Sequence, residues 1–274
     1  MFRCSGLTSL EVSVAPLLDA FVGFLSQCTQ LRTLAIEDLE FWESANDLGL
    51  HDSFLPPIVP PAVIPSLRSA SFETTTPYHL GVLFRSIILP ELEDLTIDLT
   101  SYQSGPHFPS LRQDQSQFQS FLLDLLSRSS CQLKKLRFAF LDTPTYKSVG
   151  IHWPRMFSAS PQLTHLHLMA SRWISAVPAG ASIDFISALA ISDHGLPSLP
   201  YLGNIEIDGI INALEYNILR MLESRATFRT SDSDSPPLRA KFRFVKPPSN
   251  RPPIPGVMEL LKGRNILCDS KFAR

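Results

Sequence analysis

The chain contains 274 residues, of which 44% are apolar and 18% are charged, and its formal net charge is −2. This composition excludes a disordered chain and indicates a globular protein with a substantial core. The near-neutral charge gives no support for binding to nucleic acid or to a membrane. No apolar run is long enough to span a bilayer, and the N-terminal residues lack a signal-peptide pattern, so we expect a protein of the cytoplasm or nucleus.

A short pattern, Leu-x-x-Leu-x-Leu, recurs along the whole chain. Its first copy is Leu7, Leu10 and Val12 in the segment LTSLEV. The later copies occupy residues 31–36, 67–72, 92–97, 133–138, 163–168 and 202–207, and a degenerate copy with one extra residue occupies 238–244. Apolar and polar residues alternate in these copies, so each is predicted to be a short strand with one buried side and one solvent-facing side.

Segments with a helical spacing of apolar residues lie between these strands. Apolar residues recur three and four positions apart in the segments 17–28, 78–88, 118–129, 182–191 and 211–225. The clearest is FQSFLLDLLSRS at 118–129, in which one apolar stripe lies opposite Gln, Asp, Ser and Arg. The alternation of strands with helices predicts an α/β fold with a parallel sheet.

The solvent-facing residues of the strands distinguish among parallel-sheet folds. A strand buried on both faces would be a continuous apolar run, whereas polar residues such as Glu11 and Arg137 interrupt these strands. We therefore predict an irregular leucine-rich-repeat solenoid, with a curved parallel sheet on the concave side and helices on the convex side. Its copies begin 24 to 41 residues apart, which leaves room for loops such as the proline-rich segment 54–65. We predict one domain over residues 1–274, ended by a cap of a short helix and an edge strand at about 254–274.

Several of these units resemble the leucine-rich repeats of fungal F-box proteins. The segments that carry the resemblance are CTQLRTLAIEDL, LPELEDLTIDLT, SPQLTHLHLMAS and LPYLGNIEIDG. In that family the F-box binds an Skp-type adaptor of a cullin ubiquitin ligase and the repeats select the substrate, so the resemblance implies a substrate-recognition module. We find no F-box in this sequence, because its Leu55-Pro56 opener runs directly into PIVPPAVIP. An Skp-type adaptor is therefore expected as a partner only if an F-box lies outside this chain.

The third, fifth and seventh residues of each copy are predicted to face solvent on the concave side of the solenoid. These positions supply the candidate binding residues Glu11, Glu37, Glu73, Asp94, Thr96, Asp98, Lys135, Arg137, His165, His167 and Glu206. The first four copies contribute acidic residues and no basic residue, and the sign of the charge changes at Lys135 and Arg137. We expect a non-enzymatic protein-interaction scaffold whose partner presents a basic segment to the acidic half.

His165 and His167 allow a second interpretation, because residues two apart on a strand point to the same side. Such a pair occurs in metal-dependent hydrolases, and that activity is the alternative function. The sequence contains no nucleophile elbow, no phosphate-binding glycine loop and no His-Glu-x-x-His motif, and its four cysteines form no Cys-x-x-Cys pair. We therefore expect no catalytic residue, no bound metal and no cofactor.

Overall fold

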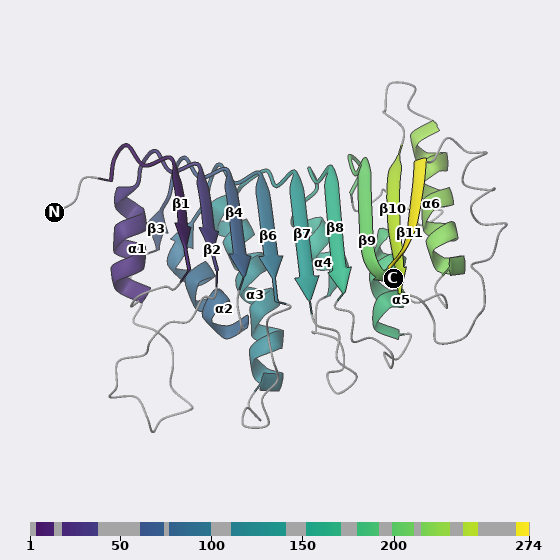
Figure 1. The fold of residues 1–274 in the computed structure, drawn as a ribbon, viewed down its shortest axis with the longest axis horizontal. Coiled ribbons are helices and arrows are strands. Elements are labelled where there is room, and N and C mark those ends of the chain that lie inside the picture. Colours follow the sequence, from purple (N-terminus) through teal and green to yellow (C-terminus); the bar gives the residue numbers. More distant parts are fainter. Residues whose placement is uncertain are drawn as a thin grey trace. The chain divides into compact units, whose positions relative to one another are not determined.

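The computed structural model of this chain describes residues 4–13, 18–37, 61–73, 77–99, 111–140, 152–170, 180–191, 199–210, 215–230, 238–245 and 267–273. Internal contacts divide the chain into two compact units, Met1–Gln132 and Leu133–Arg274. In each unit, parallel strands alternate with helices (Figure 1). The predicted α/β fold with a parallel sheet is therefore confirmed, and the single domain over residues 1–274 stays a prediction.

The first unit contains a sheet in which the strands follow the order β1-β2-β4-β6, and neighbouring strands are parallel. These strands are β1 (Ser9–Val12), β2 (Thr33–Ile36), β4 (Ser69–Glu73) and β6 (Asp94–Asp98). Figure 1 shows the helices of this unit on one side of the sheet; they are α1 (Leu18–Gln27), α2 (Pro77–Ser86) and α3 (Leu111–Ser129). A second parallel pair, β3 (Ala62–Val63) and β5 (Ile87–Ile88), contacts α1 and α3 and therefore lies on the helical side.

The second unit contains a sheet with the strand order β7-β8-β9-β10-β11, again with parallel neighbours. Its strands are β7 (Lys135–Phe140), β8 (His165–Ala170), β9 (Asn204–Ile210), β10 (Arg239–Val245) and β11 (Leu267–Ala273). Its helices are α4 (Trp153–Ser158), α5 (Gly180–Leu189) and α6 (Glu215–Thr230). Helix α5 contacts both α4 and α6, so the helices form one layer beside the sheet.

The turn that leads into each strand is built by the same backbone hydrogen bonds in successive repeats. Two adjacent amides of one repeat donate to a single carbonyl of the preceding repeat, at 2.8–3.1 Å: Arg32 and Thr33 to Thr8, Arg68 and Ser69 to Arg32, Glu93 and Asp94 to Arg68, Thr164 and His165 to Lys134, and Gly203 and Asn204 to Thr164. The first leucine of several copies also donates to the carbonyl three residues earlier, as from Leu31 to Cys28 and from Leu163 to Ser160. The sequence repeat is therefore also a repeat of backbone geometry within each unit.

The core lies between each sheet and its helices. The second leucine of the pattern is buried in both units, with 0% exposure at Leu95 and 2% at Leu166. In the first unit a Cβ atom at Gly81 on α2 would collide with the ring of Phe121 on α3, so glycine allows these two helices to approach closely. Of the helices in the described residues, none combines the length and the apolar character needed to cross a membrane.

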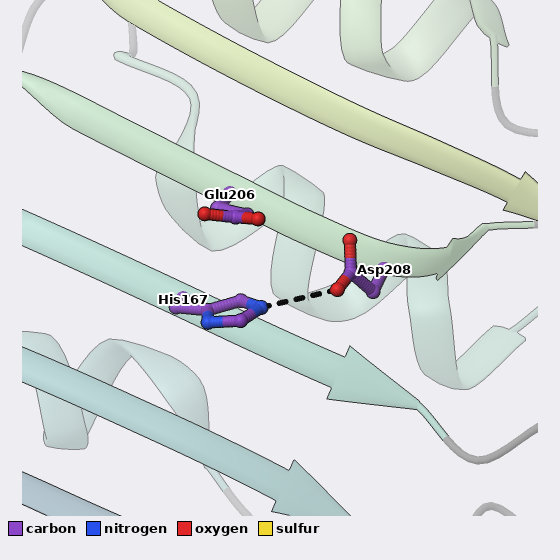
Figure 2. A group of neighbouring side chains, drawn as sticks. All are labelled: His167, Glu206 and Asp208. Carbon is purple, nitrogen blue, oxygen red and sulfur yellow. Dashed lines mark hydrogen bonds and ion pairs between the residues drawn. The ribbon is translucent and has the colours of Figure 1, made fainter. Parts of the chain in front are cut away.

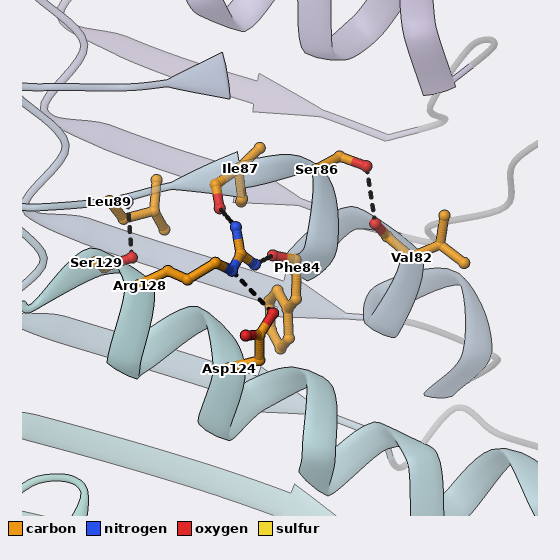
Figure 3. A network of polar contacts seen from close by, with 8 residues as sticks. All are labelled: Val82, Phe84, Ser86, Ile87, Leu89, Asp124, Arg128 and Ser129. Atoms are coloured by element: carbon orange, nitrogen blue, oxygen red, sulfur yellow. Dashed lines mark hydrogen bonds and ion pairs between the residues drawn. The ribbon is translucent and has the colours of Figure 1, made fainter. Parts of the chain in front are cut away.

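Each unit anchors a later helix to the end of an earlier one through an arginine and a neighbouring serine. On α3, Arg128 Nη2 donates to Phe84 O at 2.7 Å and Nη1 donates to Ile87 O at 3.2 Å (Figure 3). Ser129 Oγ accepts from Leu89 N at 2.9 Å, so α3 satisfies backbone groups at the end of α2 and along β5. Asp124 completes this network with an ion pair to Arg128 Nε at 2.8 Å.

Helix α6 repeats this arrangement in the second unit. Arg225 Nε donates to Leu189 O at 2.7 Å and its Nη1 donates to Leu199 O at 3.0 Å. Ser224 Oγ accepts from Ile191 N at 3.0 Å. The end of α5 and the residues that follow it are therefore held by α6 as the end of α2 is held by α3.

The structure differs from the sequence predictions at a few elements. All eight strands predicted from the repeat are present, and β11 confirms a strand near the C-terminus. Ile87–Ile88 forms β5 and is not the last turn of a helix, because two β-branched residues pair with Ala62–Val63. Helix α4 was not predicted; its proline lies in the first turn, where no amide donor is needed, and Trp153, Met156 and Phe157 are buried. The helix predicted within 254–263 lies outside the described residues.

Candidate functional site

Each sheet has one side that the helices cover and one side without a helix in the described part of the chain, and we call the latter the open face. In the first unit the strand residues of the open face are all exposed or half-buried: Ser9, Glu11, Thr33, Ala35, Ser69, Ser71, Glu73, Asp94, Thr96 and Asp98. Glu37, directly after β2, is also exposed. The positions predicted to face solvent in this unit are therefore confirmed as accessible.

The open face of the first unit is acidic. Glu73 and Asp98 are register partners on β4 and β6, and Ser69 is the register partner of Asp94. Paired strands lie about 4.8 Å apart, so carboxylates of neighbouring strands are close enough for their potentials to add. We call Glu11, Glu37, Glu73, Asp94 and Asp98 the acidic face; no described strand residue on this side is a lysine or an arginine.

On the open face of the second unit, the charge of the outward residues differs from strand to strand. Arg137, His167, Glu206 and Lys241 occupy one register row across β7, β8, β9 and β10. Lys135 and Arg137 are exposed, whereas Glu206 and Lys241 are half-buried and form an ion pair with each other. Opposite charges on neighbouring strands attract one another, so this row supports the sheet.

His165 is held by two side chains of the second unit. Its Nδ1 lies 2.8 Å from Thr164 Oγ1, and its Nε2 lies 2.8 Å from Asn204 Nδ2. An amide nitrogen can only donate, so Nε2 accepts and Nδ1 carries the proton. Thr164 Oγ1 in turn donates to Lys134 O at 3.0 Å. Both ring nitrogens of His165 are therefore engaged, and neither is available as a metal ligand without losing a hydrogen bond.

His167 takes part in a different group of side chains. Its Nε2 lies 3.2 Å from Asp208 Oδ2 on the neighbouring strand β9 (Figure 2). Glu206 lies beside them, and one ligand atom from each of these three residues falls within 4.8 Å of the other two. Two carboxylates and an imidazole thus converge on the open face, and Lys241 bonds to Glu206 from the other side.

The sequence identified two members of this cluster but not how they combine. The i, i+2 pair does place His165 and His167 on one side of β8, as predicted, but the cluster joins His167 to the next strand. Glu206 is the register partner of His167 and Asp208 is its diagonal neighbour, two residues further along β9, so both carboxylates come within reach of the imidazole across the strand pair. Asp208 was not a candidate binding residue, and it is 7% exposed although its position was expected to face solvent. The sequence could have identified Asp208, because it is the next outward residue after Glu206 in the same copy of the repeat.

Burial makes two cysteines of the first unit, Cys28 and Cys131, poor nucleophiles. Burial, with a contribution from the neighbouring Cys4 thiol, raises the pKa of Cys28 from 9.0 to about 11. Burial also raises the pKa of Cys131 above 9.0. With their pKa values raised, both side chains remain protonated thiols at neutral pH, and the thiolate, which is the nucleophilic form, is scarce.

No protein-family model, curated protein or solved structure matches this chain. The proposed function therefore rests on the geometry of the open faces and on the resemblance of the repeat segments.

Proposed function

We propose that this protein is a non-enzymatic protein-interaction scaffold of the leucine-rich-repeat type. The repeated turn geometry supports a solenoid, because the same pair of amides meets the same carbonyl position in each described repeat. Strand order follows chain order within each unit, as expected when each repeat stacks on the one before it. In such a protein, the outward residues of the strands form the binding surface.

The single observation that carries the proposal is the acidic face of the first unit. It brings Glu73 and Asp98 into register and adds Glu11, Glu37 and Asp94 on the same side of one sheet. Clustered like charges lower the stability of a fold, so a surface that retains them is best explained by a partner of opposite charge. The occupant that we propose is a lysine- or arginine-rich segment of another protein.

The charge pattern predicts how binding would respond to conditions. Exposed ion pairs each contribute little to affinity, and salt screens them. Complementary potentials mainly raise the association rate and select against acidic partners. Association should therefore be fast at low ionic strength and should slow as salt is added.

The test measures association of a fluorescently labelled lysine-rich peptide by stopped flow at several ionic strengths. The variant Glu37→Lys with Asp98→Lys reverses two charges on the acidic face and should slow association markedly at low salt. The matched control combines Glu91→Lys with Gln27→Lys and Thr29→Lys, which makes the same change in net charge at exposed residues outside the open face. If the control slows association as much as the variant of the acidic face, or if the association rate is insensitive to salt, the acidic face is an ordinary solvated surface.

The resemblance to fungal F-box proteins extends this proposal to a substrate-recognition role in a ubiquitin ligase of the cytoplasm or nucleus. In that role the acidic face receives the substrate, and an Skp-type adaptor binds an F-box outside this chain. Affinity purification of the native protein from its own cells, followed by mass spectrometry, tests this part. If the captured proteins carry basic segments but include no Skp-type adaptor, the scaffold function is supported and the ligase role is contradicted.

A further inference from the structure

We propose that His167, Glu206 and Asp208 form a binding site for one divalent transition-metal ion, of which Zn²⁺ is the first candidate. The three residues come from two paired strands of the second unit, and their ligand atoms lie within 4.8 Å of one another. Figure 2 shows the imidazole and the two carboxylates on the same side of the sheet. This inference concerns the open face of the second unit and does not depend on the proposed function of the acidic face.

The separation of His167 and Asp208 fits shared coordination. Metal–nitrogen and metal–oxygen bonds of about 2.0–2.2 Å at a tetrahedral angle place two ligand atoms roughly 3.3 Å apart. His167 Nε2 and Asp208 Oδ2 are 3.2 Å apart in the structure. A metal ion can therefore bind between these two atoms with little movement of either strand. Glu206 reaches the ion by a change of side-chain rotamer.

The donor set selects the class of metal. One imidazole nitrogen with two carboxylate oxygens suits Zn²⁺, Co²⁺ or Mn²⁺, whereas Ca²⁺ and Mg²⁺ take oxygen ligands. A divalent ion brings two positive charges to two carboxylates. Asp208 is buried, so water competes weakly with the ion at this ligand. Three protein ligands leave at least one coordination position for water.

Lys241 is the natural competitor of the metal ion. Its ammonium group is paired with Glu206, so metal binding must displace one positive charge from this carboxylate. Removing the ammonium should therefore strengthen metal binding if Glu206 is a ligand. It should have no such effect if the metal is held elsewhere on the protein.

His165 provides a matched control on the same strand. It is an exposed histidine two residues from His167, and both of its ring nitrogens are hydrogen-bonded to Thr164 and Asn204. If metal ions bound to histidines only because these are exposed, they would bind His165 in preference to His167, which is half-buried. The two substitutions to glutamine therefore separate a built site from ordinary surface binding.

The experiment titrates the metal-free full chain with Zn²⁺ by calorimetry and with Co²⁺ by visible absorption. We expect one ion per chain, and we expect His167→Gln or Asp208→Asn to weaken it by about 100-fold or more. His165→Gln should change the affinity less than about twofold, and Lys241→Met should raise it by about tenfold. Circular dichroism of each variant shows whether the fold is retained. Lys241→Met is informative even if another variant unfolds, because it is expected to bind the metal ion more tightly than the wild-type chain does.

Three outcomes would overturn the proposal. The first is the absence of saturable binding of either ion by the wild-type chain. The second is an equal loss of affinity in His165→Gln and His167→Gln, which would show that surface histidines bind the metal. The third is an unchanged affinity in Lys241→Met, which would remove Glu206 from the ligand set.

Discussion

The two units hold their helices together in the same way but at different depths. Arg128 in the first unit and Arg225 in the second each donate to two backbone carbonyls near the end of an earlier helix. Arg128 is half-buried and also pairs with Asp124, whereas Arg225 is only 4% exposed. The residues that supply the carbonyls are buried in both units, so the two anchors differ in the exposure of the arginine. Water can replace the donor that is lost at the half-buried Arg128 more easily than the one lost at Arg225.

The open faces of the two units differ more than their frameworks do. Like charges are register partners on the first face, as with Glu73 and Asp98, and opposite charges are partners on the second, as with Glu206 and Lys241. The backbone of the repeats is nevertheless the same in its turns and strand pairing. The buried pattern thus sets the fold, and the outward positions are left for binding chemistry.

The largest expected effect tests whether the repeat frameworks of the two units are equivalent. Leu95→Ala and Leu166→Ala each remove a buried leucine at the same position of the repeat, with 0% and 2% exposure. Each should lower the free energy of unfolding by about 2–5 kcal/mol, because a cavity remains. Hydrogen exchange resolved to each unit measures the loss. The control Thr96→Ala, at a half-buried residue of the open face, should stay within about 0.5 kcal/mol.

Equal losses at positions 95 and 96 would mean that the register of β6 is wrong. A large loss in one unit alone would instead mean that the two frameworks are not equivalent. Only similar losses for Leu95 and Leu166 agree with one repeat geometry.

The second expected effect separates the two arginine anchors. Arg225→Met keeps most of the apolar stem but leaves the buried Leu189 O and Leu199 O without their donors. The substitution should therefore lower the free energy of unfolding by about 2–4 kcal/mol. Arg128→Met should lower it by only about 1 kcal/mol, because Arg128 is itself half-buried and water can enter where its guanidinium was and bond to the carbonyls. Urea unfolding of both variants measures the difference. If Arg128→Met costs as much as Arg225→Met, burial does not distinguish the anchors.

The strands were predictable from the sequence because their alternation has a period that only a half-buried strand satisfies. The outward positions followed directly, and Glu73, Asp98 and His167 lie where the repeat places them. The arginine anchors were not predictable, because the repeat does not fix how one helix is positioned along the next. Burial of Asp208 was also missed, since it depends on neighbouring strands on both sides of β9.

The cluster of His167, Glu206 and Asp208 lay within reach of the sequence. Aligning the sixth and seventh copies puts His167 and Glu206 at the fifth position of each, and Asp208 at the seventh. Stacking the copies as parallel strands brings these positions together. Outward residues therefore have to be compared across copies, because the residues of this cluster are neighbours on two paired strands.

A third, smaller effect compares the same turn position in the two units. Cys28 and Ser160 each accept, through the backbone carbonyl, from the first leucine of the following strand segment. Both are buried, but Ser160 Oγ has no hydrogen-bond partner among the described residues. Ser160→Ala should therefore stabilise the second unit by about 1 kcal/mol. Cys28→Ser should destabilise the first unit by about 1 kcal/mol, because it buries a more polar group.

Thermal unfolding of the two variants measures these changes, and their signs are the decisive result. A destabilising Ser160→Ala would mean that the hydroxyl has a partner in solution, such as an ordered water. A neutral Cys28→Ser would mean that the new hydroxyl bonds to Phe24 O, which the thiol contacts at 3.4 Å.

The smallest effect tests the charge contrast of the open faces directly. Raising sodium chloride from about 0.05 to 0.5 M screens the repulsion between Glu73 and Asp98, so the amides of β4 and β6 should gain a few tenths of a kcal/mol of protection from exchange. The same salt weakens the attraction between Glu206 and Lys241, so the amides of β9 and β10 should lose a similar amount. Asp98→Asn should abolish the first change and Glu206→Gln the second. Shifts of the same sign in both sheets would show that a general salt effect outweighs the charges on the open faces.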